Sequence, residues 1–172
     1  MIPTECPPIE GFDIAGKTVA CDEIGGDYYD FIDIDQKHIG LIVADVSGKG
    51  TSAALYMAEL KGLVLSLSRI YNSPARLLVE ANRILAESMD SRTFVTMTYA
   101  VVDTEARVMR FARAGHNPLI HLEAESGRTR VLTPPGLGLG LDRYLNVFKD
   151  RLIITVSRVM RVSGVYSRKA AW

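Results

Sequence analysis

Cysteine is scarce in this sequence, and long apolar runs are absent. The 172 residues contain two cysteines, Cys6 and Cys21, which form neither a disulfide framework nor a metal-site spacing. This usage favours a reducing, cytoplasmic location. No apolar stretch approaches the roughly 18 residues of a membrane helix, and residues 1–6 lack the basic and apolar regions of a signal peptide. The sequence therefore predicts a cytoplasmic protein with no membrane partner.

The sequence also lacks net charge, because 20 Lys and Arg balance 20 Asp and Glu. Without an excess of positive charge, nucleic acid is not expected as a partner. The balance conceals an uneven distribution. Residues 1–148 carry 14 bases and 19 acids, whereas residues 149–172 carry six bases and one acid, Asp150. No Asp or Glu follows Asp150, so the chain changes character abruptly near its end.

The pattern of apolar residues predicts strands, then two helices, then more strands. Alternation over 28–35 and an apolar run over 39–46 indicate an antiparallel hairpin. Apolar residues spaced three and four apart predict a helix over 52–71, and Ser73-Pro74 is typical of the start of a second helix. Further strands are expected over 9–22, 94–103, 108–114, 119–122 and 129–132. This order predicts an α+β fold with antiparallel sheets.

Two acidic residues mark one end of the predicted hairpin. Asp27 precedes its first strand and Asp45 lies near the end of its second, so both carboxylates can reach the same end of a sheet. Half-buried carboxylates are costly unless a cation neutralises them, and Mg²⁺ or Mn²⁺ prefers such oxygen ligands. The alternative is that Asp45 only ends a strand and residues 47–51 form only a turn. Residues 47–51 lack the glycine spacing of a nucleotide-binding P-loop.

Four motifs follow one another in a specific order along the chain. They are Gly25-Gly-Asp-Tyr-Tyr-Asp30, Asp45-Val-Ser-Gly-Lys-Gly50, Ala114-Gly-His-Asn-Pro118 and Gly138-Leu-Gly140. In this order they closely resemble the catalytic domain of bacterial PPM-type serine/threonine phosphatases of the SpoIIE and RsbU group. The resemblance covers about residues 9–154. It implies two antiparallel β-sheets in a sandwich flanked by helices.

The resemblance also implies a metal centre and a class of substrate. In that group, two Mn²⁺ or Mg²⁺ ions are bridged by the residue at the position of Asp45, and the carbonyl at the position of Val46 binds one ion. The residue at the position of Asp27 serves the same centre directly or through water. Asp27 and Asp45 are therefore the expected catalytic residues. The implied partner is a phosphorylated anti-anti-sigma (STAS-type) protein that carries phosphoserine or phosphothreonine.

Four further residues are candidates for the substrate cleft. The resemblance places His116 and Asn117 close to the active cleft, and Gly48 and Lys49 follow the metal-binding motif. For His116, a structural role within the turn is a serious alternative to a contact with phosphate or water. Lys49 could attract the phosphate, but an exposed lysine in a turn is the simpler interpretation.

The sequence departs from the family pattern after Ile154. The family continues with a strand that ends in Thr-Asp-Gly or Ser-Asp-Gly, then a helix and a late Asp that completes the metal site. Here Ser157 and Arg158 stand near the expected Asp and Gly. We therefore expect an incomplete phosphatase domain over 1–154, without its C-terminal strand and helix segment, and an atypical basic tail over 155–172. A truncated or frameshifted gene would account for this change.

Three functional interpretations follow from these features. The first is a phosphatase that acts on a phosphorylated signalling protein, impaired by the loss of two of its four metal-binding aspartates. The second is a catalytically inactive domain that binds a sigma-factor regulator. The third is a fold completed by another chain, because missing strands would leave a sheet edge open for a homodimer.

Overall fold

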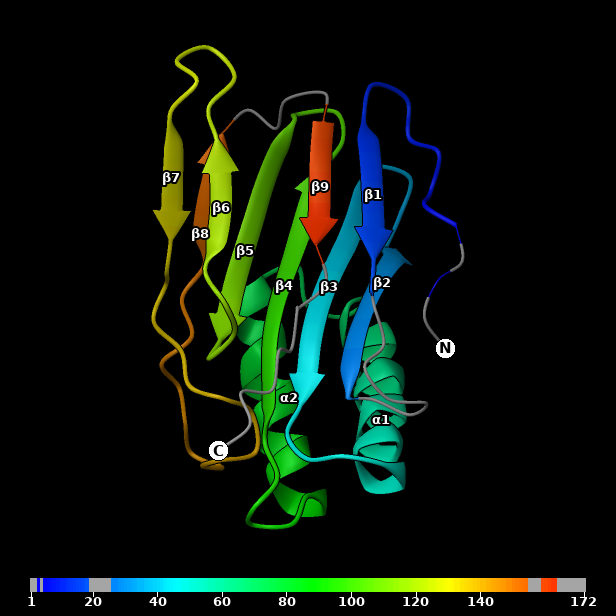
Figure 1. The fold of residues 1–172 in the computed structure, drawn as a ribbon, viewed down its shortest axis with the longest axis vertical. Coiled ribbons are helices and arrows are strands. Elements are labelled where there is room, and N and C mark those ends of the chain that lie inside the picture. The colour runs from blue at the N-terminus through cyan, green and yellow to red at the C-terminus, as the bar shows by residue number, and fades with distance from the viewer. Residues whose placement is uncertain (1–2, 4, 19–25, 155–158, 164–172) are drawn as a thin grey trace.

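The computed structural model describes residues 3, 5–18, 26–154 and 159–163 of the chain. Its centre is an antiparallel five-stranded sheet in the order β2-β3-β4-β5-β8. The strands are β2 Asp27–Asp33, β3 His38–Val46, β4 Val95–Asp103, β5 Val108–Ala114 and β8 Arg151–Ile154. Helices α1 (Thr51–Leu67) and α2 (Pro74–Ser88) lie behind this sheet in Figure 1. The predicted α+β class and the predicted antiparallel hairpin are confirmed.

The second layer differs from the predicted antiparallel sheet. Two separate ribbons lie in front of the large sheet (Figure 1). In one, β1 (Asp13–Lys17) pairs in parallel with β9 (Val159–Ser163). In the other, β6 (Leu119–Leu122) pairs antiparallel with β7 (Thr129–Leu132). The pairing of β1 with β9 joins segments far apart in sequence, and no local pattern encodes such a contact. Within the strand expected over 9–22, only 13–17 is a strand, and 19–22 lie outside the described residues.

The large sheet separates two hydrophobic cores, because successive side chains of a strand point to opposite faces. On β3, Ile42, Ala44 and Val46 belong to the core beneath the helices. Ile39 and Leu41 belong to the core on the other face, with Ile14 of β1. Asp45 continues the second series, and it therefore faces the side of the ribbons rather than the helices.

Helix α1 follows the predicted apolar stripe. The buried residues of α1 are Ala53, Met57, Leu60, Val64 and Leu67. This helix ends four residues before the predicted position 71, where the amide groups of Ile70 and Tyr71 both donate to the carbonyl of Leu67. None of the helices in the described ranges is long and apolar enough to cross a membrane.

The start of α2 is held by an aspartate that sequence reasoning did not place there. Ser73 caps the helix as predicted, and its hydroxyl accepts a hydrogen bond from the amide of Arg76 at 3.2 Å. Asp150 accepts from the Ser73 hydroxyl and from the amide of Ala75, both at 2.7 Å. A carboxylate is favourable at a helix N-terminus. The last acidic residue of the chain therefore fixes the start of β8 to α2.

An ion pair between a half-buried lysine and a buried carboxylate fixes α1 to the large sheet. Lys61 of α1 lies 2.7 Å from a carboxylate oxygen of Asp30, which also accepts a hydrogen bond from the Tyr28 hydroxyl at 2.7 Å. Burial, together with this bond, raises the pKa of Tyr28. Asp30 is therefore buried on the helix side of the sheet, away from the face that carries Asp45.

Candidate active site

Asp27 and Asp45 are direct partners across the β2–β3 ladder. The amide of Val46 donates to the carbonyl of Gly26 at 3.1 Å, so the neighbouring Asp27–Asp45 pair occupies a non-hydrogen-bonded position. The Cβ atoms of such pairs are about 4.5–5.5 Å apart, and like charges in this position repel. A bound cation would offset this repulsion. The structure thus places both carboxylates at one end of the sheet, as the sequence predicts.

Gly26 allows the peptide after Asp45 to approach β2 closely. A Cβ atom at position 26 would lie 2.4 Å from the carbonyl oxygen of Val46, which is backbone and cannot move aside like a side-chain tip. Only glycine fits this position without displacing a strand. The candidate carbonyl ligand of Val46 is therefore packed against the start of the strand that carries Asp27.

The donor set suits a hard divalent cation. Two carboxylates and one carbonyl are oxygen ligands of the kind that Mg²⁺ and Mn²⁺ bind. Asp27, Asp45 and the Val46 carbonyl could therefore form one side of a metal centre. Within the described ranges, these two carboxylates are not part of a group of three or more His, Cys, Asp or Glu side chains that could hold a metal ion. Their assignment as metal ligands stays a prediction.

Thr96 and His116 lie next to the Asp27–Asp45 pair on the neighbouring part of the sheet. Thr96 is the partner of Asp45 on β4, and its hydroxyl lies 2.8 Å from Nδ1 of His116. The His116 side chain is buried, with 7% exposure. Burial, with a further contribution from the charge of Arg113, lowers the pKa of His116 to about 4. His116 is therefore neutral at physiological pH and does not attract phosphate as a cation.

The backbone around His116 is held by contacts that the sequence pattern did not reveal. The Arg113 guanidinium donates to the carbonyl of His116 and, through Nε at 3.0 Å, to the carbonyl of Pro134. Gly115 has a φ of +63°, and a Cβ atom there would lie 2.8 Å from the amide nitrogen of Gly138. The segment that carries His116 is thus packed directly against the glycine-rich loop 136–140.

The other predicted cleft residues lie at exposed positions. Gly48, Lys49 and Asn117 are all exposed, Gly48 and Lys49 in the turn between β3 and α1. The hydroxyl of Ser47 accepts a hydrogen bond from the amide of Phe94 at 2.8 Å, and the amide of Ser47 donates to the carbonyl of Phe94 at 2.9 Å. Ser47 therefore extends the pairing of β3 with β4. Residues 47–50 connect β3 to α1, which begins at Thr51, and substrate binding by Gly48, Lys49 and Asn117 stays a prediction.

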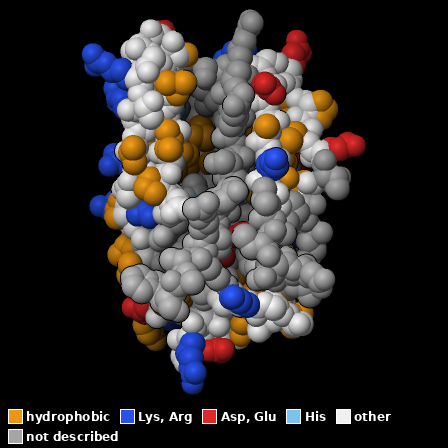
Figure 2. Space-filling view, viewed as in Figure 1, with side chains coloured by type: hydrophobic (Ala, Val, Ile, Leu, Met, Phe, Trp, Pro, Cys, Tyr) orange, Lys and Arg blue, Asp and Glu red, His pale blue; other side chains and the backbone are white. Residues whose placement is uncertain are grey.

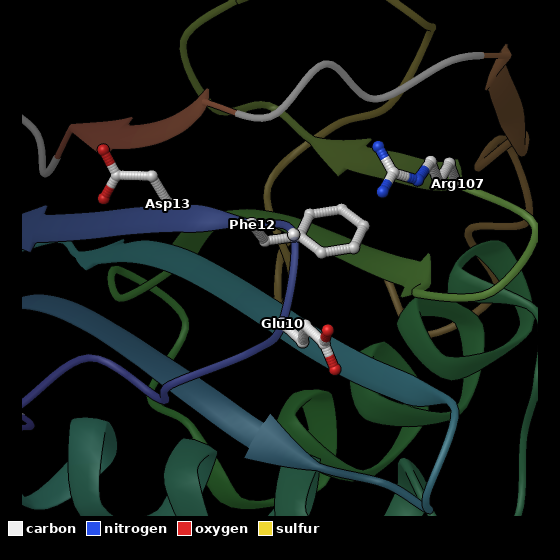
Figure 3. Close-up of a pocket in the computed structure, with 5 residues that line it drawn as sticks. Glu10, Phe12, Asp13 and Arg107 are labelled. Atoms are coloured by element: carbon white, nitrogen blue, oxygen red, sulfur yellow. The ribbon is translucent and has the colours of Figure 1, made fainter.

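A shallow concavity lies at the opposite end of the sheet (Figure 3). It is lined by Glu10 and Phe12 before β1, by Asp13 at the start of β1, and by Arg107 from the turn between β4 and β5. The Arg107 guanidinium lies 5.8 Å from the centre of the Phe12 ring. These residues contribute nothing to the edge that carries Asp27 and Asp45.

Burial of neutral His116 predicts a specific loss of stability in acid. Its pKa is about 4 in the folded protein and near 6.5 in an unfolded chain, so only the unfolded state gains this proton between those values. The free energy of unfolding should therefore decrease as the pH falls from 6.5 towards 4, by up to about 3 kcal/mol. Urea unfolding at several pH values should show a flatter profile for His116→Gln. Parallel profiles for the two proteins would contradict this assignment.

Comparison with known proteins supports the family suggested by the motifs. The fold matches the RsbU and RsbW domains of Rv1364c from Mycobacterium tuberculosis with a TM-score of 0.67 and 21% identity. The match covers 83% of this chain and 40% of the Rv1364c chain. It also matches RsbX in complex with magnesium, with a TM-score of 0.62 and 20% identity over 79% of this chain and 63% of RsbX. The chain therefore shares the fold of these solved structures.

The sequence comparison identifies the family. The family model for stage II sporulation protein E (SpoIIE) matches residues 35–152, a range that contains Asp45 and His116 and begins after Asp27. The chain therefore belongs to the SpoIIE family of bacterial serine phosphatase domains. It is 32% identical to phosphoserine phosphatase RsbU of Bacillus subtilis over 143 residues, which are 83% of this chain and 42% of RsbU. The chain thus spans less than half the length of that relative.

Proposed function

We propose that this chain is a metal-dependent phosphatase domain that removes phosphate from phosphoserine or phosphothreonine of an anti-anti-sigma type protein. The observation that carries this proposal is the direct pairing of Asp27 with Asp45 at one end of the sheet, in a member of the SpoIIE family. The similarity to phosphoserine phosphatase RsbU supports the substrate class.

In this proposal the residues at this end of the sheet have different roles. Asp27, Asp45 and the Val46 carbonyl would hold Mn²⁺ or Mg²⁺. When bound, such ions lower the pKa of a water nucleophile and neutralise charge on the phosphate. His116 is neutral and bonded to Thr96, so it orders the rim of the site by hydrogen bonding. No covalent enzyme intermediate is required, so the proposed chemistry does not need either cysteine.

The proposal includes a weakened metal centre. Two of the four acidic ligands expected for the family correspond to Asp27 and Asp45, whereas Ser157 and Arg158 stand near a position where the family has Asp and Gly. Metal affinity depends on the number and charge of the ligands. We therefore expect weak metal binding and slow turnover from a domain over 1–154, followed by the basic tail over 155–172.

A second candidate function is binding without catalysis. The observation in its favour is that the described ranges contain no cluster of three or more metal-binding side chains. A domain with this fold could still dock a sigma-factor regulator after losing turnover. The two functions make opposite predictions about phosphate release and the same prediction about binding.

A third candidate, a homodimer, is favoured by an apolar surface. On the β6–β7 hairpin, the side chains of Ile120, Leu122 and Val131 are 60–70% exposed. Apolar side chains gather over this hairpin at the left of Figure 2. Contiguous exposed apolar side chains are typical of surfaces that contact another protein chain. A single monomeric mass at high micromolar concentration would contradict the dimer.

Phosphate release measured against metal concentration tests the proposed function. With saturating Mn²⁺, we expect slow hydrolysis of p-nitrophenyl phosphate and of a phosphoserine-containing anti-anti-sigma protein, and none after chelation. Binding of the same phosphoprotein without any phosphate release would favour the non-catalytic function. Neither binding nor release would overturn both functions.

A further inference from the structure

Asn82 is a buried polar residue for which the proposed function has no use. It lies on α2 with no exposed surface, among Leu78, Ala81 and Leu85. A buried amide is costly unless its hydrogen bonds are satisfied. Asn82 meets this requirement outside its own helix, in a segment about 60 residues further along the chain.

Both ends of the Asn82 amide bind the backbone of one loop. Its Oδ1 accepts from the amide of Gly140 at 2.9 Å, and its Nδ2 donates to the carbonyl of Asp142 at 2.7 Å. Gly140 has a φ of +87°, a conformation that other residues rarely adopt. Asn82 therefore holds the C-terminal end of loop 136–140 in one conformation against α2.

The other contacts of this loop lead directly to the candidate active site. Leu139 exchanges two backbone hydrogen bonds with Val95, the first residue of β4, at 2.8 and 3.0 Å. The amide of Gly115 donates to the carbonyl of Gly136 at 3.1 Å, and Gly115 closely approaches Gly138. The loop thus connects α2 to the residue that immediately precedes His116.

We infer that Asn82 is a positioning residue that fixes loop 136–140 against Gly115. It thereby holds His116 beside the end of the sheet that carries Asp27 and Asp45. Its relevance to phosphate release rests on the proposed function, whereas the positioning itself does not. The low pKa of His116 agrees with this arrangement, because a loosened loop would admit water to the ring.

The test follows His116 and Gly140 by NMR in the metal-free protein. In Asn82→Ala, which loses both bonds, we expect the His116 pKa to rise by about one unit or more and Gly140 amide exchange to accelerate about tenfold or more. Asn82→Asp keeps the acceptor for the Gly140 amide and loses the donor to Asp142. It should therefore retain more of the Gly140 protection than Asn82→Ala does.

Two further variants separate positioning from general stability. Val64→Ala creates a comparable defect in the buried face of α1, away from the contacts of Asn82, and should leave the His116 pKa unchanged. Gly140→Ala strains the loop at its φ of +87° and places a Cβ atom 3.1 Å from Sδ of Met89 at the end of α2, but it leaves the Asn82 side chain in place. It should raise the His116 pKa even if Asn82→Ala fails to fold. An unchanged His116 pKa in Asn82→Ala or in Gly140→Ala would overturn the inference. A shift of the His116 pKa in Val64→Ala equal to that in Asn82→Ala would overturn it as well. Because these measurements need neither metal nor substrate, their failure is distinguishable from an absence of phosphatase activity.

Discussion

Replacement of Asp45 by Asn should remove the response of this protein to Mn²⁺. Asp45 is the expected bridging ligand and the direct partner of Asp27, so the change halves the carboxylate charge at the sheet end. Loss of residues that only support metal ligands already weakens binding about 10–100-fold, and we expect at least a hundredfold loss here. Titration calorimetry with Mn²⁺ on the wild type and Asp45→Asn measures this difference directly, and hydrolysis should fall with binding.

The matched control for this experiment is Asp33→Asn. Asp33 is the exposed last residue of β2, at the opposite end of the strand from Asp27. The Asp33→Asn substitution therefore removes the same charge from a position away from the candidate site. Mn²⁺ at about 100 times its dissociation constant should stabilise the wild type and Asp33→Asn by about 2.7 kcal/mol, but not Asp45→Asn. Equal stabilisation of all three proteins would place the metal elsewhere.

The second large effect is expected from Gly26→Ala, which retains every proposed ligand. The new Cβ atom would lie 2.4 Å from the Val46 carbonyl oxygen, so β2 must shift relative to β3. Strain of this kind typically costs about 1–3 kcal/mol of stability. The shift also changes the spacing of Asp27, Asp45 and the Val46 carbonyl, so Mn²⁺ affinity should fall about tenfold or more. Urea unfolding and Mn²⁺ calorimetry measure the two effects separately.

Gly62→Ala makes the same chemical change as Gly26→Ala, but it should raise the stability of the protein instead of lowering it. Gly62 is exposed on α1, and an added Cβ atom would meet nothing within 4 Å. Alanine is a better helix former than glycine, so this variant should gain about 0.5–1 kcal/mol and bind Mn²⁺ normally. Unaltered Mn²⁺ binding in Gly26→Ala would show that the sheet end tolerates the displacement, and would contradict the proposed use of the Val46 carbonyl.

Local patterns were sufficient for most of the individual elements and for part of the site. The β2–β3 hairpin, the stripe on α1 and the cap at Ser73 depend on neighbours close in sequence, so periodicity and capping predict them. The placement of Asp27 beside Asp45 follows from the same hairpin, because its turn fixes the register. By contrast, the length of β1 was less well predicted, since β1 pairs with the distant β9. The end of α1 was also misplaced, because hydrogen bonds to the Leu67 carbonyl close the helix there although the apolar spacing continues to position 71.

The sequence by itself determined the family, the α+β class and the acidic end of the hairpin, because each depends on ordered motifs or on short-range alternation. Only the tertiary structure decided the parallel pairing of β1 with β9, the burial of His116 against Thr96 and the role of Asp150 at α2. Asn82 belongs to the same group, because a single polar residue in an apolar stripe does not indicate its partner. These contacts join residues 20 to about 150 positions apart, and their geometry is set by how the layers pack rather than by the neighbouring sequence.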